Sequence, residues 1–210
     1  MKEFISVSFD LKRCQEELAA FRGLLDGKQE LEEAADVKPF FETKHQLAAL
    51  IGPCCSRMRR CDLIAFQYQL FGDFSCDLVV GDSFSKSYGF IEWEDATAGC
   101  LFRQQGKKAT PEWATRFEHG LSQVIDWFWK LDEMAHTEEF EERFGSRRAS
   151  YFGLLVAGRD SHLTHSREQR RWHWRAAKVL VNSLPIRFVT YDQLHADLAS
   201  ELDKYQPPKP

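Results

Sequence analysis

Tyr88-Gly-Phe-Ile-Glu92-Trp-Glu94 is the stretch that decides the fold of this chain, because its pattern is typical of a buried β-strand. Successive side chains of a strand point to opposite faces, so Glu92 and Glu94 share one face and Trp93 lies on the other. A buried carboxylate is costly unless it is paired or binds a metal ion. The two glutamates therefore predict a shared partner, and Asp77 on the preceding strand is placed to join them.

Short turns connect this strand to two earlier ones. Apolar residues alternate from Ile64 to Leu70, and Phe74 to Val80 forms a second run of strand type. Gly72-Asp73 and Gly81-Asp82 provide the turns between the three runs. Three strands joined in this way predict an antiparallel meander.

Two helical regions precede the meander. The first runs from about Leu11 to Leu25 and is broken by Gly27. The second runs from about Gln29 to Ile51, with an interruption before Pro39, and ends at Gly52-Pro53.

Helices and strands alternate after the meander. Thr110 as N-cap and Pro111 as the first helical residue predict a helix start. The apolar ridge of this helix consists of Trp113, Phe117, Leu121, Val124, Phe128 and Leu131. After an acidic loop, the remaining predicted elements are a strand buried on both faces at Tyr151 to Ala157, a helix with the capping box Ser166-x-x-Gln169, a strand at Ile186 to Thr190 and a helix from about Tyr191. This order predicts an α/β fold with a mixed sheet and helices on its faces.

The order of elements, with Asp77 on the second strand and Glu-x-Glu on the third, resembles the core of the PD-(D/E)xK nuclease fold. Four stretches resemble more specifically the nuclease domain of Shedu, a bacterial antiphage defence family. These stretches are Phe90-Ile-Glu-Trp-Glu-Asp-Ala96, Phe117-Glu-His-Gly-Leu-Ser-Gln-Val-Ile-Asp-Trp127, Gly153-Leu-Leu-Val-Ala-Gly-Arg159 and Thr190-Tyr-Asp-Gln-Leu194. The resemblance implies a PD-(D/E)xK-like mixed sheet, an antiparallel meander plus added strands, in a nuclease domain at residues 29–205. An N-terminal helical segment at 1–28 and a flexible tail at 206–210 flank that domain.

The same resemblance implies a metal-dependent DNA endonuclease that acts in phage defence as a homo-oligomer, a dimer or a tetramer. By position, Asp77 and Glu92 would coordinate Mg²⁺ or Mn²⁺ together with the main-chain carbonyl of Trp93. Hard oxygen ligands are those that Mg²⁺ prefers. The ion would polarise the scissile phosphate and lower the pKa of the attacking water.

One position departs from the nuclease pattern, since the third motif residue, normally Lys, is Glu94. A carboxylate cannot offset charge on a phosphate, so Glu94 would act as general base or hold a second metal ion. Lys86 on the preceding turn is a candidate substitute cation. The departure leaves a second interpretation open, a catalytically inactive nuclease-fold module that binds nucleic acid or a protein partner. Asp77 and Glu92 would then be salt-bridged or turn-facing carboxylates.

Two further site residues follow from the resemblance. Nucleases of the RecB-like branch carry Gln-x-x-x-Tyr on the helix after the meander, and here Gln123 matches the Gln while Trp127 replaces the Tyr. A partly exposed helical Gln without a catalytic role is the alternative. A further acidic ligand is expected from the first core helix, where Glu33 is preferred over Glu32 and Glu42.

The helix that begins near Ser166 carries a row of cations at spacings of four, four and three: Arg167, Arg171, Arg175 and Lys178. Such a row can neutralise several phosphates, and DNA binding would then weaken with added salt. Arg159, after the buried strand, is a further candidate for phosphate contact. Alternatively, the row is a solvated face paired with the acidic loop at Glu138 to Glu142. Trp172, Ala176 and Val179 on the neighbouring face should pack inward.

The charge distribution is asymmetric although the net charge is −4. Residues 112–142 hold nine acidic and two basic side chains, whereas residues 143–178 hold nine basic and two acidic ones. This asymmetry makes a polyanionic partner such as DNA compatible with an acidic total.

No apolar run approaches the roughly 18 residues of a membrane span and no signal peptide opens the chain, so a cytoplasmic location without membrane contact is predicted. The six cysteines form no C-x-x-C pair, which predicts reduced, buried thiols. The short N-terminal region suggests that a regulatory partner protein or assembly does any sensing. A third interpretation is a pure interaction protein that buries in an oligomer interface the helical tryptophans Trp113, Trp127, Trp129, Trp172 and Trp174.

Overall fold

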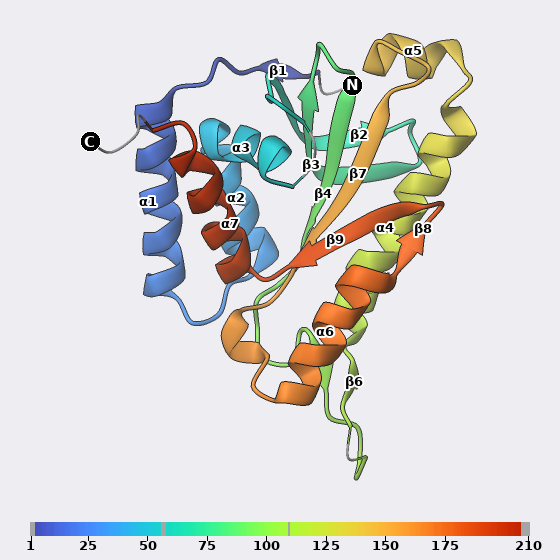
Figure 1. Cartoon of the computed structure of the whole chain (residues 1–210). Coiled ribbons are helices and arrows are strands. Elements are labelled where there is room, and N and C mark those ends of the chain that lie inside the picture. The colour runs from blue at the N-terminus through green and yellow to red at the C-terminus, as the bar shows by residue number, and fades with distance from the viewer. Residues whose placement is uncertain (1–2, 56–57, 109, 207–210) are drawn as a thin grey trace.

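A mixed sheet of seven strands forms the centre of the protein, whose computed structural model describes residues 3–55, 58–108 and 110–206 (Figure 1). In spatial order the strands are β1 (Ile5–Ser6), β2 (Leu63–Leu70), β3 (Phe74–Asp82), β4 (Ser87–Trp93), β7 (Ser150–Val156), β9 (Leu184–Val189) and β8 (Leu180–Val181). A separate two-stranded ribbon pairs β5 (Phe102–Arg103) with β6 (Glu112–Trp113). Within the predicted tail at 206–210, residues 207–210 lie outside the described residues.

The sheet changes direction at β4. On one side, β2, β3 and β4 form the predicted antiparallel meander, with Leu78 opposite Ile91. On the other side, β4, β7 and β9 run parallel, and Trp93 lies beside Val156. The antiparallel meander, the added strands and the α/β class are therefore confirmed. The short strands β1, β5, β6 and β8 were not predicted, because two residues carry too little periodicity to be recognised.

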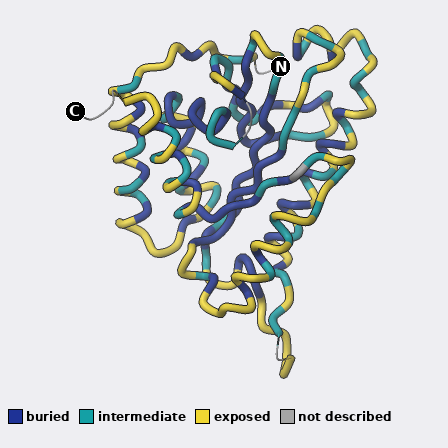
Figure 2. Tube along the Cα trace, viewed as in Figure 1, coloured by how far each residue is buried: buried dark blue, intermediate teal, exposed yellow. Residues whose placement is uncertain are grey.

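Helices cover both faces of the sheet. One face is covered by α1 (Leu11–Gly27), α2 (Lys38–Glu42), α3 (His45–Cys55) and α7 (Tyr191–Asp203), and the other by α4 (Thr115–Met134), α5 (Glu138–Phe144) and α6 (Ser166–Lys178). A π-helix, η1 (Glu33–Val37), leads into α2, and a 3₁₀ turn, η2 (Asp160–His162), follows β7. Burial is greatest along the central strands between the two helical layers (Figure 2).

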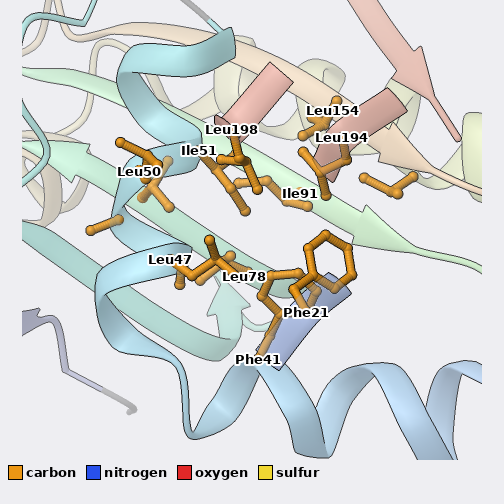
Figure 3. Packing of buried hydrophobic residues seen from close by; sticks show 14 of the residues in the cluster. Phe21, Phe41, Leu47, Leu50, Ile51, Leu78, Ile91, Leu154, Leu194 and Leu198 are labelled. Carbon is orange, nitrogen blue, oxygen red and sulfur yellow. The ribbon is translucent and has the colours of Figure 1, made fainter. Parts of the chain in front are cut away.

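Alternation along the strands divides the core into two clusters. Leu78 and Ile91 point toward α3 and α7, where Leu47, Ile51 and Leu198 meet them (Figure 3). Each such fully buried side chain contributes about 1.5–3 kcal/mol through the hydrophobic effect. The opposite faces of β3 and β4 point toward α4, so Glu92 and Glu94 lie on the α4 side, as the period of two requires.

Trp93 is the last residue of β4, and its side chain packs on the sheet face covered by α3. It is almost completely buried and stacks on Phe41 of α2, with ring centroids 4.4 Å apart and an interplanar angle of 14°. The hydroxyl of Tyr191 donates to the Glu94 carbonyl at 2.7 Å. These contacts fix the end of β4 on one face, while its carboxylates remain on the other.

The predicted helix start at Thr110-Pro111 is wrong. Glu112 and Trp113 form β6 against β5, and the Ala114 N–H donates to the Leu101 carbonyl, so the backbone stays extended up to Ala114. The helix begins at Thr115, and its predicted apolar ridge is buried from Phe117 onward.

The predicted acidic loop at Glu138 to Glu142 is the helix α5. The Thr137 hydroxyl accepts the Phe140 N–H, and Gly145 closes the helix in the left-handed conformation at φ 70°. Phe140 and Phe144 are buried between this helix and the meander, so an amphipathic pattern was present within the acidic run.

Two helix boundaries also differ from the sequence prediction. The region from Gln29 to Ile51 contains η1, α2 and α3 in succession, and Pro53 lies inside α3 instead of after it. At α6, the N-terminal pair is His165 with Glu168, whose carboxylate accepts the His165 N–H at 3.4 Å, one residue before the predicted capping box.

Candidate active site

A cavity of about 370 Å³ opens at the carboxyl end of β4, on the sheet face covered by α4. Its polar lining comes from η1, α2, β2, β3, β4 and α4. The lining residues that bear on its chemistry are Glu33, Lys38, Gln67, Asp77, Glu92, Glu94, Arg116, His119 and Gln123. The cavity thus collects side chains from the first helical region, the meander and the following helix.

Asp77 is the most constrained carboxylate of the cavity and is 6 % exposed. Its Oδ2 accepts the Trp93 N–H at 3.0 Å. Its Oδ1 accepts the Gln67 side-chain amide at 3.0 Å and lies 2.7 Å from the Lys38 ammonium. Three separate elements therefore orient this one carboxylate.

Gln67 adopts an unusual backbone conformation in the middle of β2. Its φ is 50°, in the left-handed region that disfavours residues other than glycine. The flanking pairs are Phe66 with Leu78 and Tyr68 with Cys76, which place Gln67 opposite Asp77. Strain of this kind costs on the order of 1–3 kcal/mol and is concentrated at functional sites. Here it accompanies a side-chain hydrogen bond to the Asp77 carboxylate.

Glu92 is buried, at 4 % exposure, and its Oε2 has no hydrogen-bond partner among the described residues. Burial raises the pKa of Glu92 to about 10, and the neighbouring charges of Asp77 and Glu94 contribute in the same direction. The nearby Lys38 ammonium opposes the shift without reversing it. A carboxylate in this setting binds a proton or a cation readily.

Glu94 lies under the first turns of α4 and is 2 % exposed. Its Oε2 is 2.5 Å from Arg116 Nε, although the pair lacks hydrogen-bond alignment. Burial raises the pKa of Glu94 to about 7, against the opposing charge of Arg116. Gly120 makes this closeness of helix and carboxylate possible, because a Cβ there would lie 2.8 Å from Glu94 Cγ.

Two cations that sequence reasoning missed neutralise part of the acidic cluster. The Lys38 ammonium lies 2.5 Å from Glu33 Oε1 in addition to its contact with Asp77. The Arg116 guanidinium contacts Glu33 at 2.9 Å and Asp95 at 3.1 Å in addition to Glu94. Both cations therefore connect the first helical region to the site strands.

Arg116 had a detectable signal in the sequence. Arg116, His119 and Gln123 follow one another at spacings of three and four, which places them on one face of α4. All three line the cavity. The contact of Lys38 had no such signal, because it depends on the π-helical turn η1 immediately before it.

The structure brings the predicted residues Asp77, Glu92, Glu94, Gln123 and Glu33 around one cavity. Trp93 contributes its backbone N–H to the Asp77 carboxylate, and its ring points to the opposite face of the sheet. Trp127, one turn after Gln123, is buried in the core between α4 and the sheet.

Lys86, the predicted substitute cation, is not at the site. It precedes the first residue of β4, whereas the carboxylates follow at the far end of that strand. Its side chain lies against Gly145, beyond the end of α5. The prediction was wrong because a turn residue at the start of a strand cannot reach the end of the same strand.

Arg159 was expected to contact phosphate and is instead a buried structural residue, 8 % exposed. Its guanidinium donates to both carboxylate oxygens of Asp192, at 2.8 and 2.9 Å, and to the carbonyls of Leu25 and Lys28. These four hydrogen bonds give Arg159 a structural role within the fold, and its predicted contact with phosphate stays a prediction.

The cations of α6 are held in different ways. Arg175 makes two hydrogen bonds to Glu118 of α4, at 2.6 and 2.8 Å. Arg171 donates to the Pro111 carbonyl, and Arg167 donates to the Thr110 hydroxyl. Among the described residues α6 forms no ion pair with α5, so the alternative pairing with Glu138 to Glu142 is not observed.

The donor chemistry of the cavity fits a divalent cation. Asp77 and Glu92 offer carboxylate oxygens, and Glu92 Oε2 is buried without a hydrogen-bond partner in the described structure. Within the described ranges, no three His, Cys, Asp or Glu side chains stand close enough to form a complete ligand set. Mg²⁺ commonly uses only one or two carboxylates and retains several waters, so two ligands suffice.

Comparison with known families matches residues 30–195 to the family described as Shedu protein SduA, C-terminal. The match covers well over half of the chain. The chain belongs to this Shedu family. All the cavity residues named above, from Glu33 to Gln123, lie inside the Shedu segment. No curated protein matches the sequence.

The Shedu match confirms the resemblance read from the four sequence stretches and associates the chain with antiphage defence. The matched segment begins after the whole of α1 and ends within α7, so residues 196–203 of α7 lie beyond it. Throughout residues 3–55, 58–108 and 110–206, every helix is too short or too polar to traverse a bilayer.

Proposed function

We propose that this Shedu domain is a metal-dependent DNA endonuclease that hydrolyses phosphodiester bonds in antiphage defence. The observation that carries the proposal is the convergence of Asp77, Glu92 and Glu94 in one cavity with Lys38 and Arg116. Carboxylates that hold a metal ion, together with cations that face a phosphate, are the parts that phosphodiester hydrolysis requires.

Asp77 and Glu92 would hold Mg²⁺ or Mn²⁺, with the Trp93 carbonyl as a third ligand. Glu33 would join them only on release from its ion pairs with Lys38 and Arg116. The bound ion would supply Lewis-acid polarisation of the phosphate and a water of lowered pKa. The protein's own contribution is orientation. Asp77 is fixed by a backbone N–H, an amide and an ammonium, so it reaches the ion in one defined geometry.

Lys38 takes the part that a motif lysine would play. Its ammonium lies inside the cavity at 2.7 Å from Asp77, although it comes from α2 and not from the site strand. A point charge at this position offsets negative charge on a bound phosphate. The cavity therefore contains a lysine, Lys38, although Glu94 stands at the position where the motif has Lys.

Glu94 is assigned as the proton acceptor. Its carboxylate lines the cavity beside Glu92 and is held by Arg116 on α4. His119 and Gln123, on the same helix face, border the space in which a water would be oriented. Replacing Glu94 by Gln keeps its shape and removes its basicity, so hydrolysis should be lost while DNA binding is retained.

The experiment is cleavage of supercoiled plasmid in EDTA, Mg²⁺ or Mn²⁺ by the wild type and the variants Asp77→Asn and Lys38→Met. Asp126→Asn is the matched control, because Asp126 is an exposed carboxylate on α4 outside the cavity. Metal-dependent nicking or linearisation that is lost in Asp77→Asn and kept in Asp126→Asn is the expected result. Cleavage that persists in EDTA would contradict the proposal.

Binding of Mn²⁺ by calorimetry provides a second readout that does not depend on an activating trigger or on substrate choice. The wild type should bind Mn²⁺ and Asp77→Asn should bind it at least tenfold more weakly, in line with the loss of a direct ligand. Equal Mn²⁺ binding by the two proteins would remove the assignment of the metal site.

A second candidate function is a non-catalytic nuclease-fold module that binds DNA. The observation that favours it is the charge neutralisation of Glu33, Asp77 and Glu94 by Lys38 and Arg116, which stabilises the acidic cluster without a metal ion. This candidate predicts DNA affinity that is the same in EDTA and in Mg²⁺, with no cleavage in either.

A further inference from the structure

A second cavity, of about 470 Å³, lies along the exposed side of α6, where it faces β6. Four arginines and two tryptophans line it: Arg167, Arg170, Arg171, Arg175, Trp113 and Trp174. We refer to this surface as the Arg-Trp groove. Its residues take no part in the acidic cavity described above.

Most of the positive charge in the Arg-Trp groove is uncompensated. Arg175 is the exception, since Glu118 neutralises it. Among the described residues, no carboxylate lies within salt-bridge distance of Arg167, Arg170 or Arg171. The described surface of this acidic protein thus carries three guanidinium groups without a carboxylate partner within two turns of one helix, although Arg167 and Arg171 donate to neutral oxygens. Such a pattern attracts a polyanion.

The two tryptophans of the groove differ in what covers them. Trp113 is capped by cations, with the guanidinium carbons of Arg175 and Arg171 at 4.7 and 5.3 Å from its ring centre. Trp174 is 64 % exposed and lies one helical turn after Arg170 and Arg171. An exposed indole beside arginines that lack a carboxylate partner offers an aromatic face to a ligand that is itself flat and anionic.

We infer that the Arg-Trp groove binds single-stranded DNA, with an unpaired base stacked on Trp174 and backbone phosphates on Arg167, Arg170 and Arg171. A groove with arginines and no exposed aromatic side chain would bind duplex DNA as well as single-stranded DNA. A stacking platform favours a single strand, because the bases of a duplex already stack on each other and present no free face. The choice of DNA as the nucleic acid rests on the proposed endonuclease function.

The helix α4 contacts residues of both the Arg-Trp groove and the acidic cavity. Arg116 of α4 reaches Glu94 in the cavity, while Glu118, two residues later, reaches Arg175 in the groove. A strand held on α6 is thereby connected through one rigid helix turn to the cavity residues. This arrangement suits an enzyme that grips an unpaired strand beside the bond that it cleaves.

The test is fluorescence anisotropy of a labelled thymidine oligonucleotide of about 15 nucleotides, roughly one OB-fold footprint, titrated with the full chain in EDTA. The variants are Trp174→Ala and Arg170→Gln. Trp129→Ala is the control, because Trp129 is 57 % exposed on α4 and does not line the groove. Loss of one stacking contact should weaken binding of Trp174→Ala by roughly 5- to 150-fold. Arg170→Gln should reduce the slope of log affinity against log salt by about 0.7, and Trp129→Ala should bind as the wild type does.

A matched duplex of the same length separates stacking from charge. Trp174→Ala should bind this duplex with unchanged affinity, whereas Arg170→Gln should weaken it. Wild-type affinity of Trp174→Ala for the single strand would overturn the inference. Equal losses for single strand and duplex would also overturn it, and so would a loss of self-association in sedimentation without any change in DNA binding, which would assign Trp174 to an interface between copies.

The inference and the proposed function can fail separately. The single-strand titration runs in EDTA, so its result does not depend on a metal ion in the acidic cavity. If Trp174→Ala binds normally while plasmid cleavage requires Asp77 and metal, the groove assignment fails and the nuclease stands. If the groove binds as expected and no metal-dependent cleavage or Mn²⁺ binding occurs, the nuclease fails and the binding site stands.

Discussion

Replacing Lys38 by Met should destabilise the protein in the absence of divalent metal, because it removes the cation that faces a buried carboxylate. The Lys38 ammonium lies 2.7 Å from Asp77 Oδ1 and 2.5 Å from Glu33 Oε1, and the lysine side chain is 25 % exposed. Met keeps the length of the side chain and its apolar stem, so the change isolates the charge.

The magnitude follows from the surroundings of Asp77. At 2.7 Å and an effective dielectric constant of about 20, the Coulomb attraction is about 6 kcal/mol before desolvation is subtracted. Removing one partner of a fully buried pair costs about 3–5 kcal/mol. Asp77 keeps its two hydrogen bonds, from Trp93 and Gln67, so we expect a loss of about 2–4 kcal/mol.

Urea denaturation in EDTA measures this loss as a change in the free energy of unfolding, and a thermal melt should shift downward by roughly 4–16 °C. Lys12→Met is the control, because Lys12 is an exposed lysine on α1 with no role in the cavity. Its effect should stay within about 0.5 kcal/mol.

A double-mutant cycle with Asp77→Asn tests the cause directly. In that background the Asp77 charge is absent and Lys38 keeps only its contact with Glu33. Lys38→Met should therefore cost less than in the wild type, and the coupling energy should be about 2 kcal/mol or more. A coupling energy below about 0.5 kcal/mol would show that the ammonium does not stabilise Asp77, and the charge argument would be refuted.

Three other perturbations have defined outcomes. Gly120→Ala should gain up to about 1 kcal/mol of helix propensity, but its Cβ would lie 2.8 Å from both Glu94 Cγ and the buried Leu155 Cδ1. Overpacking against Leu155, at about 1–3 kcal/mol, should lower the urea midpoint, and displacement of Glu94 should lower plasmid cleavage at least tenfold. Gln67→Gly should be more stable than Gln67→Ala by on the order of 1 kcal/mol. Both variants lose the side-chain hydrogen bond to Asp77, and only Gly relieves the strain of the left-handed backbone. Equal urea midpoints for the two variants would contradict this. Burial of Asp192 favours its protonated form, but hydrogen bonds from the Arg159 guanidinium outweigh this effect and hold the pKa of Asp192 below its usual range. The stability from Asp192 is therefore present above pH about 4 and lost as pH falls through the lower folded pKa, so urea unfolding of wild type and Asp192→Asn should converge below pH 4.

Much of the fold follows from local periodicity. The alternation at residues 64–70, 74–80 and 88–93 is sufficient to place the meander, and the spacing of Phe117, Leu121 and Val124 is sufficient to place α4. The missed helix α5 had its own signals, Thr137 as N-cap and Gly145 as C-cap, which the dense acidic charge obscured. The start of α4 was misplaced because tertiary pairing of β6 with β5 overrides the local preference of Thr110-Pro111.

Only part of the candidate site could be predicted from the sequence. The period of two places Glu92 and Glu94 together because both belong to one strand. The contacts of Lys38 depend on how η1 turns the chain before α2, and the contacts of Arg159 depend on Asp192, 33 residues later. The spacing of residues along the chain predicts neither set of contacts. Local patterns therefore identify the carboxylates, whereas the cations that balance them become visible only in the folded structure.

The guanidinium of Arg159 also links segments of the chain that are synthesised at different times. It joins the carbonyls of Leu25 and Lys28 to Asp192. It therefore links α1 to α7, which lie side by side (Figure 1). Ribosomes add about 5–20 residues per second, so roughly 10–30 s separate synthesis of α1 from synthesis of its α7 partner. During that interval part of the apolar face of α1, including the side of Phe21 that later contacts His195, remains accessible to chaperones.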